Sequence, residues 1–221
     1  MLNRIEIVTA LHNSTQRNYL ARMADEKVEA MKVAREYEIE YWDGDRRYGY
    51  GGYTFREGYW RPVAERLVER FELQSDAAIL DVGCGKAFLL YELQLILPDA
   101  RIVGVDRSQH GLNSRHHSAR GEFIQLRVEE GLPFKEGEFD LVISLATLHN
   151  LRLPELFFSL QEITRVGRKK YCMVESYRNE LELFNLQCWA LTAESFFHVD
   201  EWEWILASAG YDGDYEFIFF E

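Results

Sequence analysis

Residues 77–87 read Ala77-Ala-Ile-Leu-Asp81-Val-Gly83-Cys-Gly85-Lys-Ala87, and this stretch decides the fold. The apolar run from Ala77 to Val82 predicts a short buried strand. The two glycines that follow permit a tight turn, and the residues from Ala87 to Leu97 predict a helix that Pro98 ends. The stretch therefore predicts a strand, a glycine turn and a helix in direct succession.

The same alternation continues along the chain. Further strands are expected at residues 101–106, 122–126, 139–145, 170–175 and 215–220. Further helices are expected at residues 109–120, 154–166 and 199–209, with helical character also between 177 and 197. Strands that alternate with helices predict a parallel sheet covered on both faces. We therefore expect an α/β, doubly wound, mostly parallel sheet of six or seven strands in a single domain at 1–221.

The glycine turn bears on the class of cofactor. A dinucleotide fingerprint, G-x-G-x-x-G, needs a third glycine where this chain has Phe88, which disfavours a nicotinamide or flavin site. The pattern Asp81-x-Gly83-x-Gly85-x-Ala87 instead resembles the first motif of class I S-adenosylmethionine-dependent methyltransferases. Asp106, at the end of the second strand, and the run Leu132-Pro-Phe-Lys-Glu-Gly-Glu-Phe-Asp-Leu-Val-Ile-Ser144 resemble later motifs of that family.

This resemblance implies a Rossmann-like methyltransferase core at residues 73–221, preceded by a helical extension and lid loop at residues 1–72. It also implies S-adenosyl-L-methionine as the cofactor, with Asp106 accepting hydrogen bonds from the ribose hydroxyls. Val128 stands where the family often has an acid that contacts the adenine amine, so Glu129, or main-chain and apolar contact, would replace that acid. The implied cofactor-binding residues are Asp81, Gly83, Cys84, Gly85, Asp106, Arg107, Val128, Glu129, Ser144 and Leu145.

Methyl transfer from a sulfonium is an in-line displacement, so the protein mainly aligns the acceptor atom and excludes water. No metal or covalent nucleophile is required, and a hydroxyl acceptor benefits from a general base. The candidate catalytic residues are His149 after the fourth core strand, Glu175 at the end of the fifth, and Tyr50 upstream. The alternatives are that His149 caps or packs in a loop and that Glu175 caps the next helix.

The loop Tyr41-Trp-Asp-Gly-Asp-Arg-Arg-Tyr-Gly-Tyr-Gly-Gly-Tyr53 combines rings, acids and arginines. In the family that the chain resembles, an N-terminal segment commonly lies over the cofactor, so this loop is expected to be a lid that holds the acceptor. The alternative is an ordered loop that fills the open edge of the sheet. Arg17 and Arg22 are expected to be solvated arginines beside a capped helix, with a place in the same clamp as the alternative. The expected substrate-binding residues are Tyr48, Tyr53, Arg46 and Arg178.

The charge balance limits the partners. The chain has 25 Lys+Arg and 37 Asp+Glu, a formal net charge of -12, which argues against nucleic acid. Residues 178–221 carry most of the excess acid, and acids such as Asp214 are expected to form a solvated face. The chain has neither an apolar run of about 18 residues nor a leader pattern, so we expect no membrane contact and a cytoplasmic location. The cysteines Cys84, Cys172 and Cys188 lack metal-ligand spacing, and we expect buried thiols and no metal.

Three functions remain open. The first is transfer of a methyl group to an oxygen or nitrogen atom of a small-molecule acceptor. The chain as a whole resembles small bacterial methyltransferases of sugar or surface-polysaccharide biosynthesis, which suggests a sugar or sugar nucleotide, with a small amine or carboxylate metabolite as the alternative. The second function is an NAD-dependent oxidoreductase, and the third is a non-catalytic S-adenosylmethionine-binding partner protein. Both a monomer and a homodimer are open.

Overall fold

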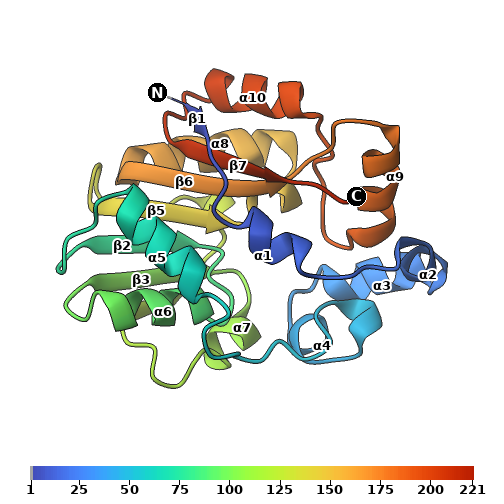
Figure 1. The fold of residues 1–221 in the computed structure, drawn as a ribbon, viewed down its shortest axis with the longest axis horizontal. Coiled ribbons are helices and arrows are strands. Elements are labelled where there is room, and N and C mark those ends of the chain that lie inside the picture. The colour runs from blue at the N-terminus through green and yellow to red at the C-terminus, as the bar shows by residue number, and fades with distance from the viewer. Residues whose placement is uncertain (1) are drawn as a thin grey trace.

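A single seven-stranded sheet forms the centre of the protein (Figure 1). The computed structural model describes residues 2–221, and the strand order is β1-β7-β6-β5-β2-β3-β4. Every strand pair formed by the described residues is parallel. The predicted α/β doubly wound sheet is therefore confirmed. The strands are β1 (Asn3–Arg4), β2 (Ala78–Val82), β3 (Arg101–Asp106), β4 (Glu122–Gln125), β5 (Phe139–Leu145), β6 (Gly167–Glu175) and β7 (Asp214–Ile218).

Helices cover both faces of this sheet (Figure 1). One face packs against α5 and α6 through residues such as Leu67 and Leu93, and the other packs against α8 and α10 through Leu160 and Trp202. The α-helices are α1 (Thr9–Asn13), α2 (Tyr19–Ala24), α3 (Lys27–Ala34), α4 (Ile39–Trp42), α5 (Arg61–Arg70), α6 (Phe88–Ile96), α7 (Gln109–Asn113), α8 (Leu153–Val166), α9 (Glu180–Trp189) and α10 (Val199–Ser208). Three 3-10 helices are η1 (Arg46–Tyr48), η2 (Val128–Glu130) and η3 (Leu148–Asn150).

The strand order reverses at β2, which pairs with β3 on one side and with β5 on the other. The chain runs outward from β2 to β3 and β4, and then returns to β5 and continues to β6 and β7. In open α/β sheets, ligands bind outside the carboxyl ends of the strands at such a reversal. The glycine turn at 83–87 lies at this point.

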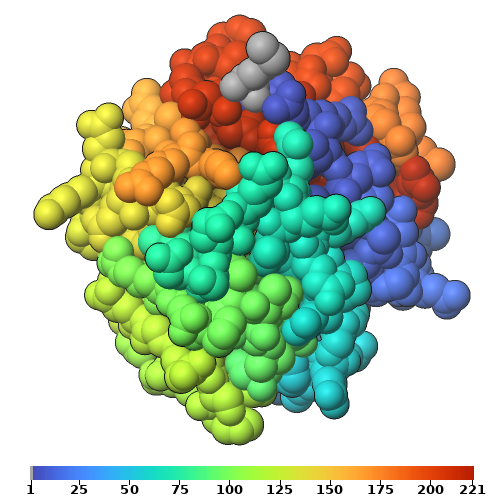
Figure 2. Space-filling view, turned by 60° about the vertical axis from the view of Figure 1, so that its left-hand side comes forward, coloured from blue at the N-terminus to red at the C-terminus, as the bar shows by residue number. Residues whose placement is uncertain are grey.

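The N-terminal segment is joined to the last strand by a buried carboxylate. β1 pairs with β7, and Glu216 in β7 is fully buried. Its carboxylate accepts hydrogen bonds from the N–H groups of Ile7, Val8 and Thr9 at 2.6–3.0 Å and from the Tyr171 hydroxyl. In Figure 2 the blue N-terminal segment lies beside the red C-terminal part of the chain. The expected helical extension thus begins with a strand that the sequence pattern did not predict.

Three expectations about local structure need correction. α7 ends at Asn113 because the chain then turns to bring His116 against the ring of Tyr91, at 3.7 Å between ring centroids. Between residues 177 and 197 only α9 is helical. Asp214 and Glu216 are buried, so the acids of the C-terminal stretch do not all form a solvated face. Across residues 2–221 no helix combines the length and the apolar character needed to cross a membrane.

Candidate active site

The turn after β2 fits closely against two neighbouring segments. Gly83 has a φ of +85°, a region that residues with a side chain rarely adopt. The N–H groups of Gly83 and Cys84 both donate to the Val105 carbonyl, at 2.8 and 3.1 Å. A Cβ atom on Gly83 would lie 1.9 Å from Thr147 Oγ1. The absence of a side chain at residue 83 therefore keeps the backbone close to the loop after β5.

Asp106 ends β3 beside this turn, and two backbone donors fix its side chain. Oδ2 accepts the N–H of Gly85 at 2.7 Å, and Oδ1 accepts the N–H of Ser108 at 2.7 Å. Burial raises the pKa of Asp106, and these two hydrogen bonds oppose the shift. A carboxylate oxygen has two lone pairs, so each oxygen keeps one acceptor site for a ligand.

A first cavity lies at the carboxyl ends of β2, β3 and β5. Its lining includes the charged residues Asp106 and Arg107 and the apolar residues Leu126, Val128 and Leu151. The guanidinium of Arg107 lies 4.4 Å from the ring centroid of Tyr37. The remaining lining residues are Tyr41, Trp42, Tyr50, Val82, Gly83, Val105, Arg127, Glu129, Leu145, Ala146, Thr147 and Asn150.

The structure places the predicted cofactor-binding residues in two groups. The residues that line the first cavity are Gly83, Asp106, Arg107, Val128, Glu129 and Leu145. Asp81, Cys84, Gly85 and Ser144 are not part of its lining. Ser144 is fully buried and its hydroxyl donates to the Val82 carbonyl at 3.0 Å, while the Cys84 thiol is buried. The side chains of Ser144 and Cys84 therefore lie outside this lining, and cofactor contact at these positions stays a prediction.

Asp81 is the unusual member of the second group. Burial raises its pKa to about 8, and the nearby charge of Asp106 adds to the shift. Its Oδ1 atom is buried and has no hydrogen-bond partner within residues 2–221. A buried acceptor without a partner is costly, and such atoms often face a bound ligand or water. Asp81 therefore offers an unpaired acceptor in β2, two residues before the glycine turn.

A second cavity of about 470 Å³ adjoins the first. It is formed by the N-terminal segment, the loop at 46–60, the end of β6 and the residues after α9. Among the predicted residues, its lining contains Glu175, Tyr50, Tyr53 and Arg46. Tyr41, Tyr50 and Ala146 line both cavities, so the two spaces meet at these residues. The ring of Tyr50 stacks on Trp42 at 5.3 Å between centroids.

His149 contacts both the backbone and the carboxylate of Glu175. His149 is buried and lines neither cavity, so direct contact with a substrate, as expected of a catalytic residue, does not fit its position. Burial lowers the pKa of its imidazole, although the charge of Glu175 opposes the shift. Nδ1 accepts the backbone N–H of Glu175 at 3.2 Å, which assigns the proton to Nε2, 3.5 Å from Glu175 Oε2. A neutral His149 therefore orients the Glu175 carboxylate.

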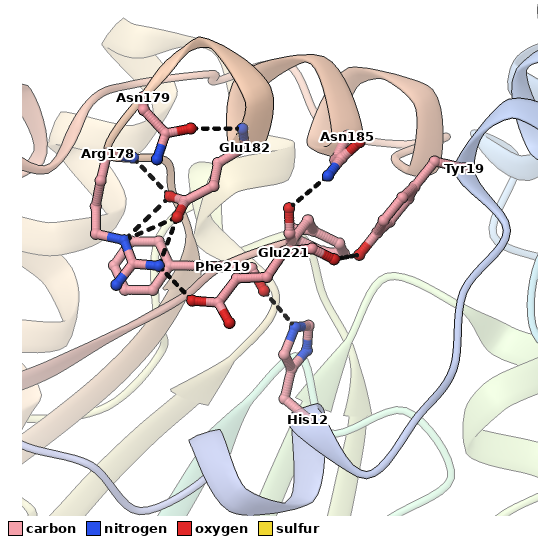
Figure 3. A network of polar contacts seen from close by, with 9 residues as sticks. His12, Tyr19, Arg178, Asn179, Glu182, Asn185, Phe219 and Glu221 are labelled. Carbon is pink, nitrogen blue, oxygen red and sulfur yellow. Dashed lines mark hydrogen bonds and ion pairs between the residues drawn. The ribbon is translucent and has the colours of Figure 1, made fainter.

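Two predicted substrate-binding residues lie elsewhere. Tyr48 packs beside a small cluster that contains Ala30 and lines neither cavity. Arg178 is exposed and points to Glu182 and Glu221, with its guanidinium 4.0 Å from the ring centroid of Phe219 (Figure 3). Its charge is satisfied within the protein, which corrects the expectation that it binds a substrate phosphate.

Several lining residues of the second cavity were not among the expected substrate-binding residues. Arg17 and Arg22 line the second cavity. This position favours the alternative, in which they help to hold the acceptor, over the solvated arginines expected from sequence. Trp189, at the end of α9, was not foreseen, because a single tryptophan near the end of a helix gives no functional signal.

The residues of the first cavity fit S-adenosylmethionine. Asp106 at the end of β3 suits the ribose hydroxyls, and the turn at Gly83, which has no space for a side chain, suits the methionyl chain. The apolar wall at Val128 suits the adenine. The doubly wound parallel sheet and this site define a class I S-adenosylmethionine-dependent methyltransferase.

Comparison with known proteins agrees with this class. A family model described as a methyltransferase domain matches residues 73–210, and the chain belongs to that family. The chain is 28% identical over 147 residues to a malonyl-[acyl-carrier protein] O-methyltransferase of Legionella pneumophila, an alignment that covers 64% of this chain and 51% of that protein. It is 29% identical over 140 residues to the mitochondrial arginine-hydroxylase NDUFAF5 of Mus musculus, covering 60% of this chain and 38% of that protein. The chain thus spans about half the length, or less, of these relatives.

A solved structure shows the same fold. The plantazolicin methyltransferase BpumL in complex with SAH matches with a TM-score of 0.59 and 17% identity, over 86% of this chain and 77% of that chain. The cofactor of the class is S-adenosylmethionine.

Proposed function

We propose that this protein transfers the methyl group of S-adenosylmethionine to an oxygen or nitrogen atom of a small molecule bound in the second cavity. The observation that carries this proposal is the wall shared by the two cavities at Tyr41, Tyr50 and Ala146. An acceptor in the second cavity would meet a cofactor in the first at this point. Positioning of the acceptor atom at the methyl carbon supplies much of the rate enhancement in such a displacement.

The cofactor, when bound, supplies an electrophilic methyl group and its own leaving group. Asp106 would hold the ribose hydroxyls with the acceptor sites that Gly85 and Ser108 leave free. Val128 and Leu126 would pack against the adenine, and Trp42 would cover the cavity from the lid. These contacts would fix the cofactor beside the shared wall at Tyr50.

Glu175 is the proposed general base for a hydroxyl or protonated amine acceptor. Its carboxylate lines the second cavity, and its side chain is 16% exposed. His149 orients it through the contacts described above. The Tyr50 hydroxyl lies at the shared wall, where its role is to donate a hydrogen bond to the acceptor.

The other functions are less well supported. A nicotinamide site is disfavoured because Phe88 is buried at the start of α6, where a pyrophosphate turn needs a glycine. A non-catalytic role would give no use to the Glu175 carboxylate in the second cavity or to its contact with the buried His149. A sugar or sugar nucleotide remains our proposed acceptor within the small-molecule class, because the rings of Tyr53 and Trp189 offer stacking surfaces. We also propose that the protein acts in the cytoplasm.

The test combines binding with turnover. Calorimetry should show saturable binding of S-adenosylhomocysteine and none of NAD. Labelled S-adenosylmethionine, incubated with pooled sugars, sugar phosphates, amines and carboxylates, should then yield a labelled acceptor. Binding of NAD alone, or binding of S-adenosylhomocysteine without transfer to any pool, would reject the proposal.

A variant of the base separates chemistry from binding. Glu175→Gln should lower kcat by about 100-fold, the usual contribution of a general base, and leave the affinity for S-adenosylhomocysteine unchanged. The matched control is Glu65→Gln, because Glu65 is exposed and pairs with Arg61 away from both cavities. Unchanged turnover in the Glu175 variant would show that the base lies elsewhere or that none is used.

A further inference from the structure

The second cavity is basic, although the whole chain is acidic. The formal net charge of the chain is -12, yet Arg17, Arg22, Arg46 and Arg56 all line this cavity. Within the described lining, Glu175 is the single carboxylate. Burial lowers the pKa of His12, the remaining titratable base of the lining, to about 4, so it is neutral at pH 7. The cavity therefore offers a concentrated positive charge to whatever enters it.

Three of these arginines converge on one ring. The guanidinium carbons of Arg22, Arg46 and Arg17 lie 5.1, 5.2 and 5.5 Å from the ring centroid of Trp189. Cation–π contact orients each planar group against the indole. Three like charges around one ring repel one another, and burial together with Arg46 lowers the pKa of Arg22 to about 10. The cluster therefore carries an electrostatic cost that a bound anion would relieve.

The charges of Glu175 and Asp25 act on Arg17 and Arg22, respectively, from beyond ion-pair distance. Within residues 2–221 none of the three has a carboxylate at ion-pair distance, whereas Arg47 next in sequence pairs with Asp25 and Glu26. Their hydrogen bonds within the described residues go to backbone carbonyls and to the His12 ring. Arg22 and Arg46 each bond through Nη1 alone. Their Nη2 groups therefore keep donors for a ligand.

Resting on the function proposed above, we infer that the methyl acceptor carries an anionic group, a carboxylate or a phosphate, which Arg22 and Arg46 bind beside Trp189. The planar guanidinium donates two parallel hydrogen bonds that match a carboxylate or a phosphate. Arg17 adds charge and is fixed by His12 and Thr15. Because Tyr50 and Glu175 line the same cavity, the acceptor places its anionic group at Trp189 and its reacting atom at Tyr50.

Anion binding can be measured without any methyl transfer. The probes are inorganic phosphate and malonate, each titrated calorimetrically at constant ionic strength set with sodium chloride, and glucose is the neutral control. We expect saturable binding of phosphate or malonate and none of glucose, and the tighter probe identifies the anionic group. Arg22→Gln and Arg46→Gln should each weaken that binding by about tenfold, the effect of losing one charge-assisted hydrogen bond.

The matched control removes the same charge from the surface. Arg168 is exposed and pairs with Asp140 at 2.8 Å, outside both cavities. Arg168→Gln should bind the anion as the wild type does, and all three variants should keep the wild-type affinity for S-adenosylhomocysteine. Absence of saturable binding of both anions, or wild-type binding in the Arg22 and Arg46 variants, would overturn the inference.

The labelled-methyl assay then separates the two proposals. Label transferred to the carboxylates or sugar phosphates, and lost in Arg22→Gln, supports both. Label transferred to neutral acceptors at equal rates in the wild type and Arg22→Gln overturns the anionic acceptor and leaves methyl transfer standing. Saturable anion binding that depends on Arg22, without transfer to any acceptor, rejects methyl transfer and leaves the anion site standing.

Discussion

The substitution Glu216→Gln tests how the N-terminal segment is held to the sheet. The buried carboxylate of Glu216 accepts three backbone N–H groups, of Ile7, Val8 and Thr9, as well as the hydroxyl of Thr9. Glutamine keeps one acceptor oxygen and turns an NH₂ group toward these donors, so about two charge-assisted hydrogen bonds are lost. At about 1.5–3 kcal/mol for each, we expect the free energy of unfolding to fall by about 3–6 kcal/mol.

Urea unfolding measures this change directly. The midpoint should fall while the slope m stays constant, since the surface exposed on unfolding is unchanged. A loss of this size is a large part of the 5–15 kcal/mol that is typical of a domain. The affinity for S-adenosylhomocysteine should be retained in native buffer, because residues 7–13 do not line the first cavity.

The control variant uses the same chemistry at the surface. Glu203 is exposed and its carboxylate accepts the Tyr215 hydroxyl at 2.9 Å. Glu203→Gln should lower the free energy of unfolding by less than about 1 kcal/mol, as for other exposed polar contacts. If Glu216→Gln cost no more than this control, the carboxylate would not be the anchor of the N-terminal segment.

Two further predictions concern the first cavity. Gly83→Ala should abolish measurable S-adenosylhomocysteine binding, because its Cβ would lie 1.9 Å from Thr147 Oγ1. The control is Gly58→Ala, because Gly58 has a similar φ of +72° but open space around the Cβ. This variant should lose only about 1 kcal/mol of stability and should bind S-adenosylhomocysteine as the wild type does. Equal binding by the two variants would refute the steric argument. Because burial raises the pKa of Asp81 from its ordinary value of 3.8 to about 8, the folded state holds a proton that the unfolded state releases between these two values. Stability should therefore fall from pH 4 to pH 8 relative to Asp81→Asn, as measured by urea midpoints across that range, and parallel curves for the two proteins would contradict the pKa shift.

The sheet could be predicted because its signals are local. The apolar runs at β2, β3 and β5 are each complete within a few residues, and the glycines at 83 and 85 mark the turn at which the strand order reverses. β1 has two residues and no apolar pattern, and it pairs with Asp214 and Tyr215, more than 200 positions away in the chain. Such a contact leaves no trace in local periodicity.

The residues of the site could be predicted where they belong to a local motif, and could not where distant segments meet. Asp106 and Gly83 belong to a motif at the end of a strand, so their positions follow from the strand itself. Ser144 belongs to the same strand as Leu145, but successive side chains point to opposite sides and only Leu145 reaches the cavity. The convergence of Arg17, Arg22 and Arg46 on Trp189 joins segments far apart in sequence, and only the tertiary structure brings them together.

The shared wall at Tyr41, Tyr50 and Ala146 bears on how the sequence of this protein can evolve. Apart from those three residues, the walls of the two cavities come from different positions along the chain. Substitutions among residues 8–22 and 173–192 can alter which molecule is accepted without touching a residue that lines the first cavity. If the acceptor binds as proposed, acceptor preference and methyl-donor affinity depend on different residues, and a new acceptor specificity could be selected while the use of the cofactor is preserved.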